Sequence, residues 1–169
     1  MKNLLVFVIF CSHSLAYGQV ESVASRTAPF IPGLPPESTI AEVKTEETYS
    51  ITITVTNIRN RDGVIRFKFY DDSTPFPDLN GFLKVVVPKT EITGDSLKMT
   101  FYGFKSQNMA IALLDDENNN VKLDIGWFFP KEGHAFSDYY HNALRKPVYS
   151  DFSFLLTENK HVTMKMKYY

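Results

Sequence analysis

The chain has 169 residues, a formal net charge of −1 and a hydrophobic content of 44%. This length suits one domain with a sizeable core, and the aromatic content of 14% is typical of a folded chain rather than a disordered one. The charge is so close to balance that composition provides no general basic field, and therefore no argument for binding nucleic acid or an anionic membrane.

The N-terminus has the layout of a secretory signal peptide. Lys2 precedes an apolar run that ends at Phe10, and small residues follow at Ala16 and Gly18. The run is shorter than the roughly 18 residues that cross a bilayer, so we expect no transmembrane segment. We expect cleavage between Ala16 and Gln19, which assigns residues 1–18 to the signal peptide.

Cleavage there would make the protein exported, in the periplasm, associated with the cell envelope or secreted. The one cysteine of the chain, Cys11, would leave with the signal peptide, so the mature chain would have no disulfide and no reactive thiol. The alternative is a lipid anchor on Cys11. It is disfavoured because the bulky Phe10 stands where lipoprotein processing requires a small residue.

Residues 19–47 mix prolines with small and charged residues and show no sustained periodicity. This composition predicts a flexible N-terminal arm or linker. The alternative is that the segment packs on the domain as an edge strand.

From Tyr49 onwards, apolar residues alternate with polar ones, as in half-buried strands. The runs cover residues 51–55, 65–69, 83–87, 97–101, 109–114, 152–156 and 162–168. The turn "NRDG" predicts a β-hairpin between the first two runs. Pro88 makes the third an edge strand or marks its end, and 109–114, apolar on both faces, suits a central strand. About seven strands over residues 48–169 predict an all-β sandwich.

Side-chain oxygens recur at alternate positions after the predicted central strand. Asp116, Asn118, Asn120 and Asp124 carry them, and the carbonyl of Lys122 lies between the last two. Alternate residues of a tight loop can surround one hard cation, as the first positions of an EF-hand loop do. The absence of cysteine and histidine from the loop favours calcium over zinc or iron.

Two positions depart from this pattern. Val121 occupies the place of the glycine that makes the sharp turn, and Trp127 stands where a closing glutamate is expected. Glu117 or Glu132 could supply a carboxylate instead. The alternative is a turn without a cation, because Asn and Asp side chains bond to nearby backbone groups and tolerate left-handed conformations.

The continuation through residues 126–142 is long for a hairpin turn, and long ordered loops on rigid sandwiches often bind ligands. Its aromatic side chains could plug an end of the sandwich, or one or two exposed rings could stack on a carbohydrate or peptide. The candidate ligand surface comprises Trp127, Phe128, His134, Tyr139 and Tyr140.

The same region holds the candidates for catalysis. They are His134, Ser137, Asp138, His141 and Asp151. No G-x-S-x-G nucleophile elbow is present, and the two histidines lack the spacing of a helical metal site. We therefore expect no catalytic site and no enzyme.

Four stretches carry a resemblance to a known family. They are "NIRNRDG", "FKFYD", "AIALLDDENNNVKLD" and "PKEGHAFSD", in this order over residues 48–169. The chain thus resembles a bacterial secreted family catalogued as domain of unknown function 2141. The resemblance implies an immunoglobulin-like or transthyretin-like β-sandwich in a cell-envelope or secreted protein, and it implies no activity.

The chain departs from the family pattern in residues 115–124, which we call the acidic loop. Asn119 and Val121 replace two family glycines, and Asp115 replaces a histidine and adds a carboxylate. We expect an exported, extracytoplasmic binding or structural module, with calcium at the 115–124 loop as a candidate stabiliser. The alternative is an accessory domain that recognises a carbohydrate or peptide through the 126–142 loop, and a hydrolase comes third.

Overall fold

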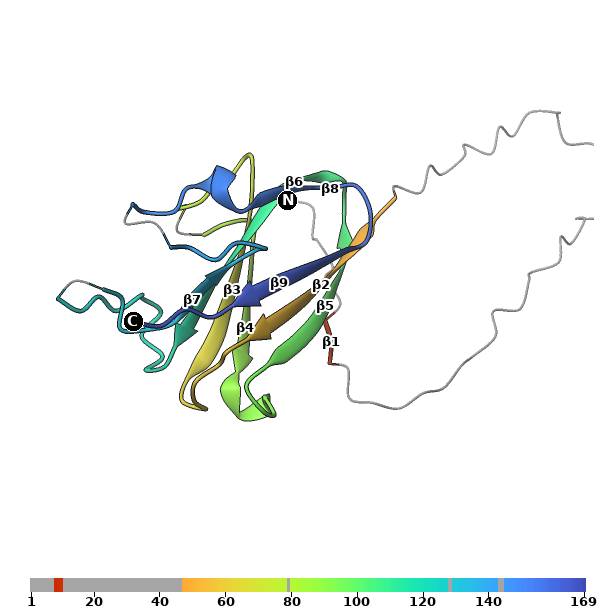
Figure 1. Ribbon diagram of the computed structural model, residues 1–169. Helices are drawn as coiled ribbons and strands as arrows, with labels where there is room; N and C mark the ends of the chain where they lie inside the picture. The colour runs from red at the N-terminus through yellow and green to blue at the C-terminus, as the bar shows by residue number, and fades with distance from the viewer. Residues whose placement is uncertain (1–7, 11–46, 79, 128, 143–144) are drawn as a thin grey trace, which may run out of the picture. The chain divides into compact units, whose positions relative to one another are not determined.

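The computed structural model describes residues 8–10, 47–78, 80–127, 129–142 and 145–169 (Figure 1). Residues 11–46 lie outside the described residues. They include all of the predicted arm except Glu47. The strands are β1 (Val8–Phe10), β2 (Tyr49–Thr56), β3 (Val64–Asp71), β4 (Leu83–Pro88), β5 (Leu97–Phe104), β6 (Gln107–Asp116), β7 (His134–Phe136), β8 (Ser153–Leu156) and β9 (Lys160–Lys165). Two short 3-10 turns complete the elements, η1 (Lys89–Glu91) and η2 (Tyr149–Asp151).

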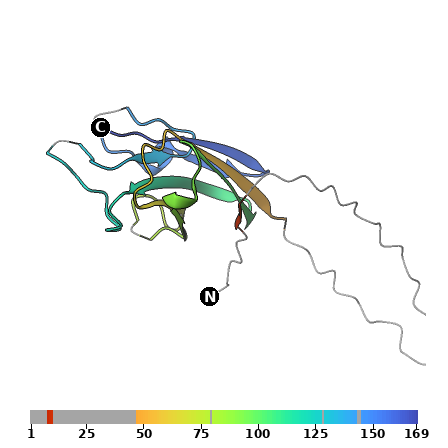
Figure 2. The same cartoon turned by 90° about the horizontal axis from the view of Figure 1, so that it is seen from below.

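The strands form two sheets, which confirms the predicted all-β architecture. One sheet has the order β1-β5-β2-β9, and the other has the order β4-β3-β6-β7, with β8 also pairing with β6. Figures 1 and 2 show the sheets as two layers. β6 is central, as predicted, and β4 both lies at an edge and ends at Pro88, so the two readings of that proline hold together. In the described part, no helical segment has the length and apolar character needed to span a membrane.

The prediction that β2 and β3 form a β-hairpin is wrong. β2 pairs with β5 and β9, whereas β3 pairs with β4 and β6 in the other sheet. The connection between them crosses from one layer to the other and buries Ile58 on the way. The alternating pattern identifies a strand with one buried face, but it carries no information about which strand pairs with it.

β7 lies inside the segment that was predicted to be one long loop. Its three residues pair with Ala112–Leu114 of β6, and three residues are too few to show a period. The strand divides the predicted loop at His134–Phe136. Residues 126–133 and residues 137–142 are therefore two separate segments on either side of a strand.

The main core lies between the sheets and takes one face of each long strand. It includes Ile51, Ile53, Val55, Ile65, Phe67, Phe69, Phe101, Met109, Ile111, Val162 and Met164. A smaller cluster, Tyr70, Ala110, Phe136 and Phe152, lies beside Phe76 and Tyr139. For Phe136, the reading of the loop aromatics as packing residues is therefore confirmed.

β1 lies within the predicted signal peptide. It pairs antiparallel with β5 over Met99–Phe101. Cleavage after Gly18 would remove β1 and leave β5 at the edge of its sheet.

Replacing Gly63 with Ala should strongly destabilise the domain. A methyl group there would lie 2.0 Å from the carbonyl oxygen of Asp116, in a residue with a φ of 73°. We expect a loss of about 3 kcal/mol in the free energy of unfolding, measured by urea denaturation. Gly94→Ala is the matched control, because Gly94 has a φ of 69° with nothing within 4 Å, and it should cost about 1 kcal/mol. Equal losses would show that the contact with Asp116 is unimportant.

Candidate functional site

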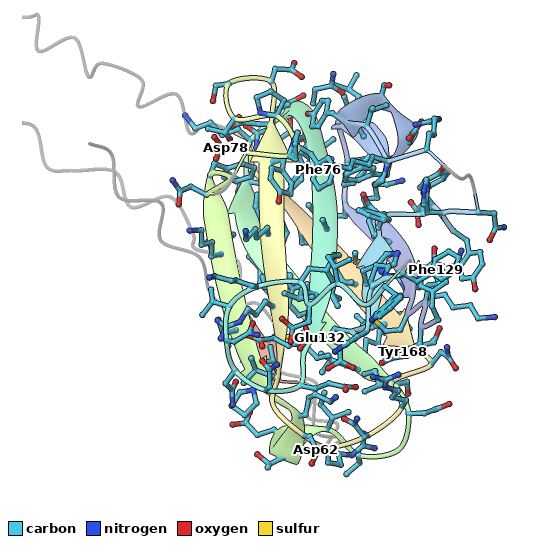
Figure 3. All side chains as sticks on the ribbon, turned by 90° about the vertical axis from the view of Figure 1, so that its left-hand side faces the viewer. Asp62, Phe76, Asp78, Phe129, Glu132 and Tyr168 are labelled. Atoms are coloured by element: carbon cyan, nitrogen blue, oxygen red, sulfur yellow. The ribbon has the colours of Figure 1, made fainter. Side chains whose placement is uncertain are left out.

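Three of the four stretches that carry the family resemblance meet at one end of the sandwich, where β6 ends, whereas "FKFYD" runs toward the start of β6. Figure 3 shows Asp62, Glu132 and Tyr168 toward this end. β6 finishes with Asp115 and Asp116, and both residues are fully buried. Two adjacent buried carboxylates need partners, since an unpaired buried charge is very unfavourable.

Asp115 forms a buried ion pair. Its Oδ1 atom lies 2.7 Å from Nζ of Lys89, and both side chains are 0% exposed. The hydroxyl of Tyr168 donates to Oδ2 at 2.6 Å. Burial and the hydrogen bond to Asp115 raise the pKa of Tyr168, so the phenol stays protonated as a donor. Lys89 also donates to the side-chain oxygen of Asn60.

Asp116 starts the loop and holds it folded back. The carboxylate forms a salt bridge with Arg66 of β3. Its Oδ1 accepts the backbone N–H of Asn120 and its Oδ2 that of Val121, both at 3.0 Å. The loop after β6 therefore closes on the last carboxylate of the strand.

Glu117 connects this loop to the segment between β2 and β3. Arg59 donates to both carboxylate oxygens at 2.7 Å, and Asn60 donates at 2.8 Å. These contacts lower the pKa of Glu117, chiefly through the bidentate Arg59 bond. Arg59 also donates to the carbonyl of Lys131 at 2.9 Å. The "NIRNRDG" stretch thus holds the acidic loop in place through these hydrogen bonds.

Glu132 ties the two ends of the acidic loop together. The side chain is only 3% exposed. Its Oε1 accepts the backbone N–H of Glu117 at 3.2 Å, and its Oε2 accepts that of Asp124 at 3.1 Å. The glutamate of "PKEG" therefore fixes the loop through backbone hydrogen bonds.

The predicted cation ligands lie together in this loop and bond to one another. Asn118 and Asn120 donate their side-chain N–H groups to Asp124, at 2.7 Å and 2.9 Å. Their oxygens accept the backbone N–H of the residue two positions on, Asn120 and Lys122 respectively. Within the described ranges, no group of three His, Cys, Asp or Glu is arranged to hold a metal ion.

Two residues of the loop adopt left-handed backbone conformations. Asn119 has a φ of 59° and Val121 a φ of 68°. The family resemblance implies glycine at both positions, and glycine adopts this conformation without steric cost. Asn tolerates it, whereas the β-branched Val121 is strained by about 1–3 kcal/mol.

A second turn follows and projects from the sandwich. The backbone N–H of Lys131 donates to the carbonyl of Asp124 at 2.8 Å, and that of Gly126 to Phe129 at 2.7 Å. We call residues 124–127 and 129–131 the Trp127 hairpin. It extends away from the strands beside the C-terminus (Figures 1 and 2), and Trp127 is 97% exposed.

Apolar residues are exposed at every second position along this segment. We call them the apolar ridge: Val121, Leu123, Ile125, Trp127 and Phe129. The ring of Phe129 stacks on Tyr169 with 4.7 Å between centroids, which links the hairpin to the C-terminus. The ridge therefore stands on a base held by Glu132 and Tyr169.

The structure separates the residues of the predicted ligand surface. Trp127 and Tyr140 are exposed, and Phe128 lies outside the described residues. His134 stacks on Tyr169, and burial together with Lys167 and His141 lowers its pKa to about 4. Tyr139 is half-buried and bonds to His141 at 3.1 Å. The exposed residues of the same segment as Trp127 are instead Val121, Leu123, Ile125 and Phe129. The sequence analysis did not include them, although their alternation is visible in the sequence.

The residues considered for catalysis hold loops in place. Ser137 donates to the carbonyl of Phe152 at 2.7 Å and accepts from the backbone N–H of Ile111. The two ring nitrogens of His141 contact the Tyr139 hydroxyl and the Arg145 carbonyl. Asp138 accepts the backbone N–H of Thr163, and Asp151 pairs with Arg145. These bonds join no histidine to Ser137 or to a carboxylate among the residues described.

Breaking the buried ion pair should destabilise the domain more than removing it. Lys89→Met leaves Asp115 unpaired in the core, and we expect a loss of about 3–5 kcal/mol in the free energy of unfolding. The double variant Lys89→Met/Asp115→Leu removes both charges and should lose less than the sum of the single variants. Urea denaturation of all four proteins measures the coupling, and additive losses would contradict a direct interaction.

Comparison with known proteins identifies the family. The family model for domain of unknown function 2141, described as an uncharacterized protein conserved in bacteria, matches residues 53–165. This range runs from β2 to the end of β9 and includes the whole acidic loop and the Trp127 hairpin. No curated protein and no solved structure gives a significant match. Since the match covers more than half of the chain, the protein belongs to the family of domain of unknown function 2141.

Proposed function

We propose that the protein is an extracytoplasmic binding module that contacts its partner through the apolar ridge. The exported location rests on the N-terminal layout of Lys2, the apolar run and the small residues after it. The observation that carries the binding role is the nearly complete exposure of Trp127 at the tip of a projecting hairpin. Tryptophan is strongly enriched at the centres of binding surfaces and rarely left in water without a use.

The base of the hairpin supports this role. Glu132 bonds to both ends of the acidic loop, and Arg59 bonds to Glu117 and to the carbonyl of Lys131. A surface that is already ordered loses less conformational entropy on binding, so more of the contact energy contributes to affinity. The sandwich and the charged network together hold the base of the hairpin that carries Trp127.

Trp127 is the only tryptophan of the chain, so its fluorescence reports directly on the ridge. The free protein should show the emission of a solvated indole, readily quenched by acrylamide. A bacterial cell-envelope fraction should shift the emission to shorter wavelength and protect it from quenching. In sedimentation with this fraction, Trp127→Ala should bind about tenfold less than wild type.

Tyr102→Ala is the matched control, because Tyr102 is an exposed aromatic residue on β5, in the other sheet. It should sediment with the envelope fraction like wild type. An unchanged spectrum in the presence of the envelope, or equal losses in both variants, would rule out the ridge as the contact surface.

We further infer that calcium stabilises the acidic loop. The loop carries Asp116, Asn118, Asn120 and Asp124 at the spacing of cation ligands. A specific observation supports this, since Val121 at the sixth position has the left-handed conformation that glycine takes in such loops. Calcium would replace the bonds from Asn118 and Asn120 to Asp124 with direct coordination.

Thermal melting in calcium and in chelator tests this inference. If calcium is present at about 100 times its Kd, it should stabilise the protein by about 2.7 kcal/mol, with a higher Tm than in chelator. Asp124→Ala should abolish the difference between the two conditions. Asp95→Ala, the same change in an exposed turn, should retain it. Identical melting curves for the wild type would refute calcium binding.

A further inference from the structure

The chemistry of the apolar ridge narrows the class of partner. Its residues are exposed by 39% to 97%, and three of them, Val121, Leu123 and Ile125, are aliphatic. Single exposed apolar residues are ordinary, whereas several exposed apolar residues gathered in one short segment indicate an interaction surface. A carbohydrate site needs flat ring faces with polar groups around them, which aliphatic side chains do not provide.

Two exposed cationic side chains lie beside the ridge. Lys122 lies between two ridge residues and Lys131 at the end of the hairpin, and both are exposed. Among the described residues, neither lysine side chain forms a salt bridge or a hydrogen bond. The carboxylate of Asp124, also in the hairpin, is half-buried and accepts hydrogen bonds from Asn118 and Asn120, so the two lysines are the exposed charges of this segment.

The shape and the charge of this surface together favour a lipid bilayer. A second copy of the chain would bring Lys122 and Lys131 close to the same residues of its partner, which is repulsive. A bilayer interface accepts a projecting apolar tip, places tryptophan at the level of the headgroups and attracts lysines when the lipids are anionic. The ridge and its lysines satisfy all three requirements.

We propose that the Trp127 hairpin is an interfacial anchor for anionic lipid surfaces, a proposal that rests on the binding role of the ridge. Ile125 and Trp127 enter the headgroup region, and Lys122 and Lys131 contact lipid phosphates. The anchor lies in the interface and does not span the membrane.

Vesicles of stated composition test the proposal with Trp127 as the probe. Vesicles of phosphatidylcholine with phosphatidylglycerol should shift the emission of the wild-type protein to shorter wavelength, and vesicles of pure phosphatidylcholine should not. Added salt should weaken the binding, because it screens the attraction between lysines and lipid phosphates. Sedimentation with the same vesicles gives the partition coefficients.

Matched variants separate the apolar and the basic contributions. Ile125→Asp should lower the partition coefficient by about tenfold. Leu155→Asp should leave it unchanged, since Leu155 is equally exposed, at 62% against 63%, but lies on β8. Lys122→Gln and Lys131→Gln should each lower it by roughly fivefold. Lys98→Gln on β5 should have no effect. All these positions are exposed, so the variants are expected to fold, and far-ultraviolet circular dichroism verifies it.

The outcomes distinguish this proposal from the binding role on which it rests. A shift with the envelope fraction but none with phosphatidylglycerol vesicles would refute the lipid anchor and leave the binding module intact. Equal binding to both kinds of vesicle would refute the role of the lysines. A protein that responds neither to vesicles nor to the envelope fraction would overturn both proposals.

Discussion

The buried pair of Asp115 and Lys89 is the constraint on which this end of the sandwich depends. Two charges with no exposure to water require close partners, and they find them in each other, in Asn60 and in Tyr168. The pair joins the end of β6 to η1, to the connection after β2 and to the segment after β9. Segments far apart in the sequence are thereby fixed at one place, because moving any of them would leave a charge unpaired in the core.

The acidic loop and the Trp127 hairpin build on that fixed end. Asp116 folds the start of the loop back, Glu117 attaches it to Arg59, and Glu132 closes it between Glu117 and Asp124. Each of these carboxylates binds backbone or guanidinium donors, so the loop keeps its shape through hydrogen bonds. The strain at Val121 is tolerated because the surrounding bonds determine its conformation. The result is a polar, rigid base beneath an apolar tip, and this contrast underlies the proposed binding role.

The sequence patterns predicted the strands better than their partners. The alternation in residues 51–55 and 65–69 located β2 and β3, because one face of each strand is buried and the other is not. The hairpin prediction failed because the turn chemistry of "NRDG" serves another purpose. Its Gly63 packs against the backbone of Asp116 and Glu117, and Asn60 bonds to Glu117. β7 was missed because its edge pairing involves only three residues.

By itself, the sequence determined the all-β class, the central position of β6 and the segment that carries the family signatures. These follow from local properties, namely side-chain periodicity, turn residues and the order of short motifs. The tertiary structure alone decided that Glu132 ties the acidic loop, that Lys89 neutralises Asp115, and that Trp127 is exposed while His134 is packed. These are contacts between segments distant along the chain, and a burial or pairing partner at such a distance leaves no periodic trace in the sequence.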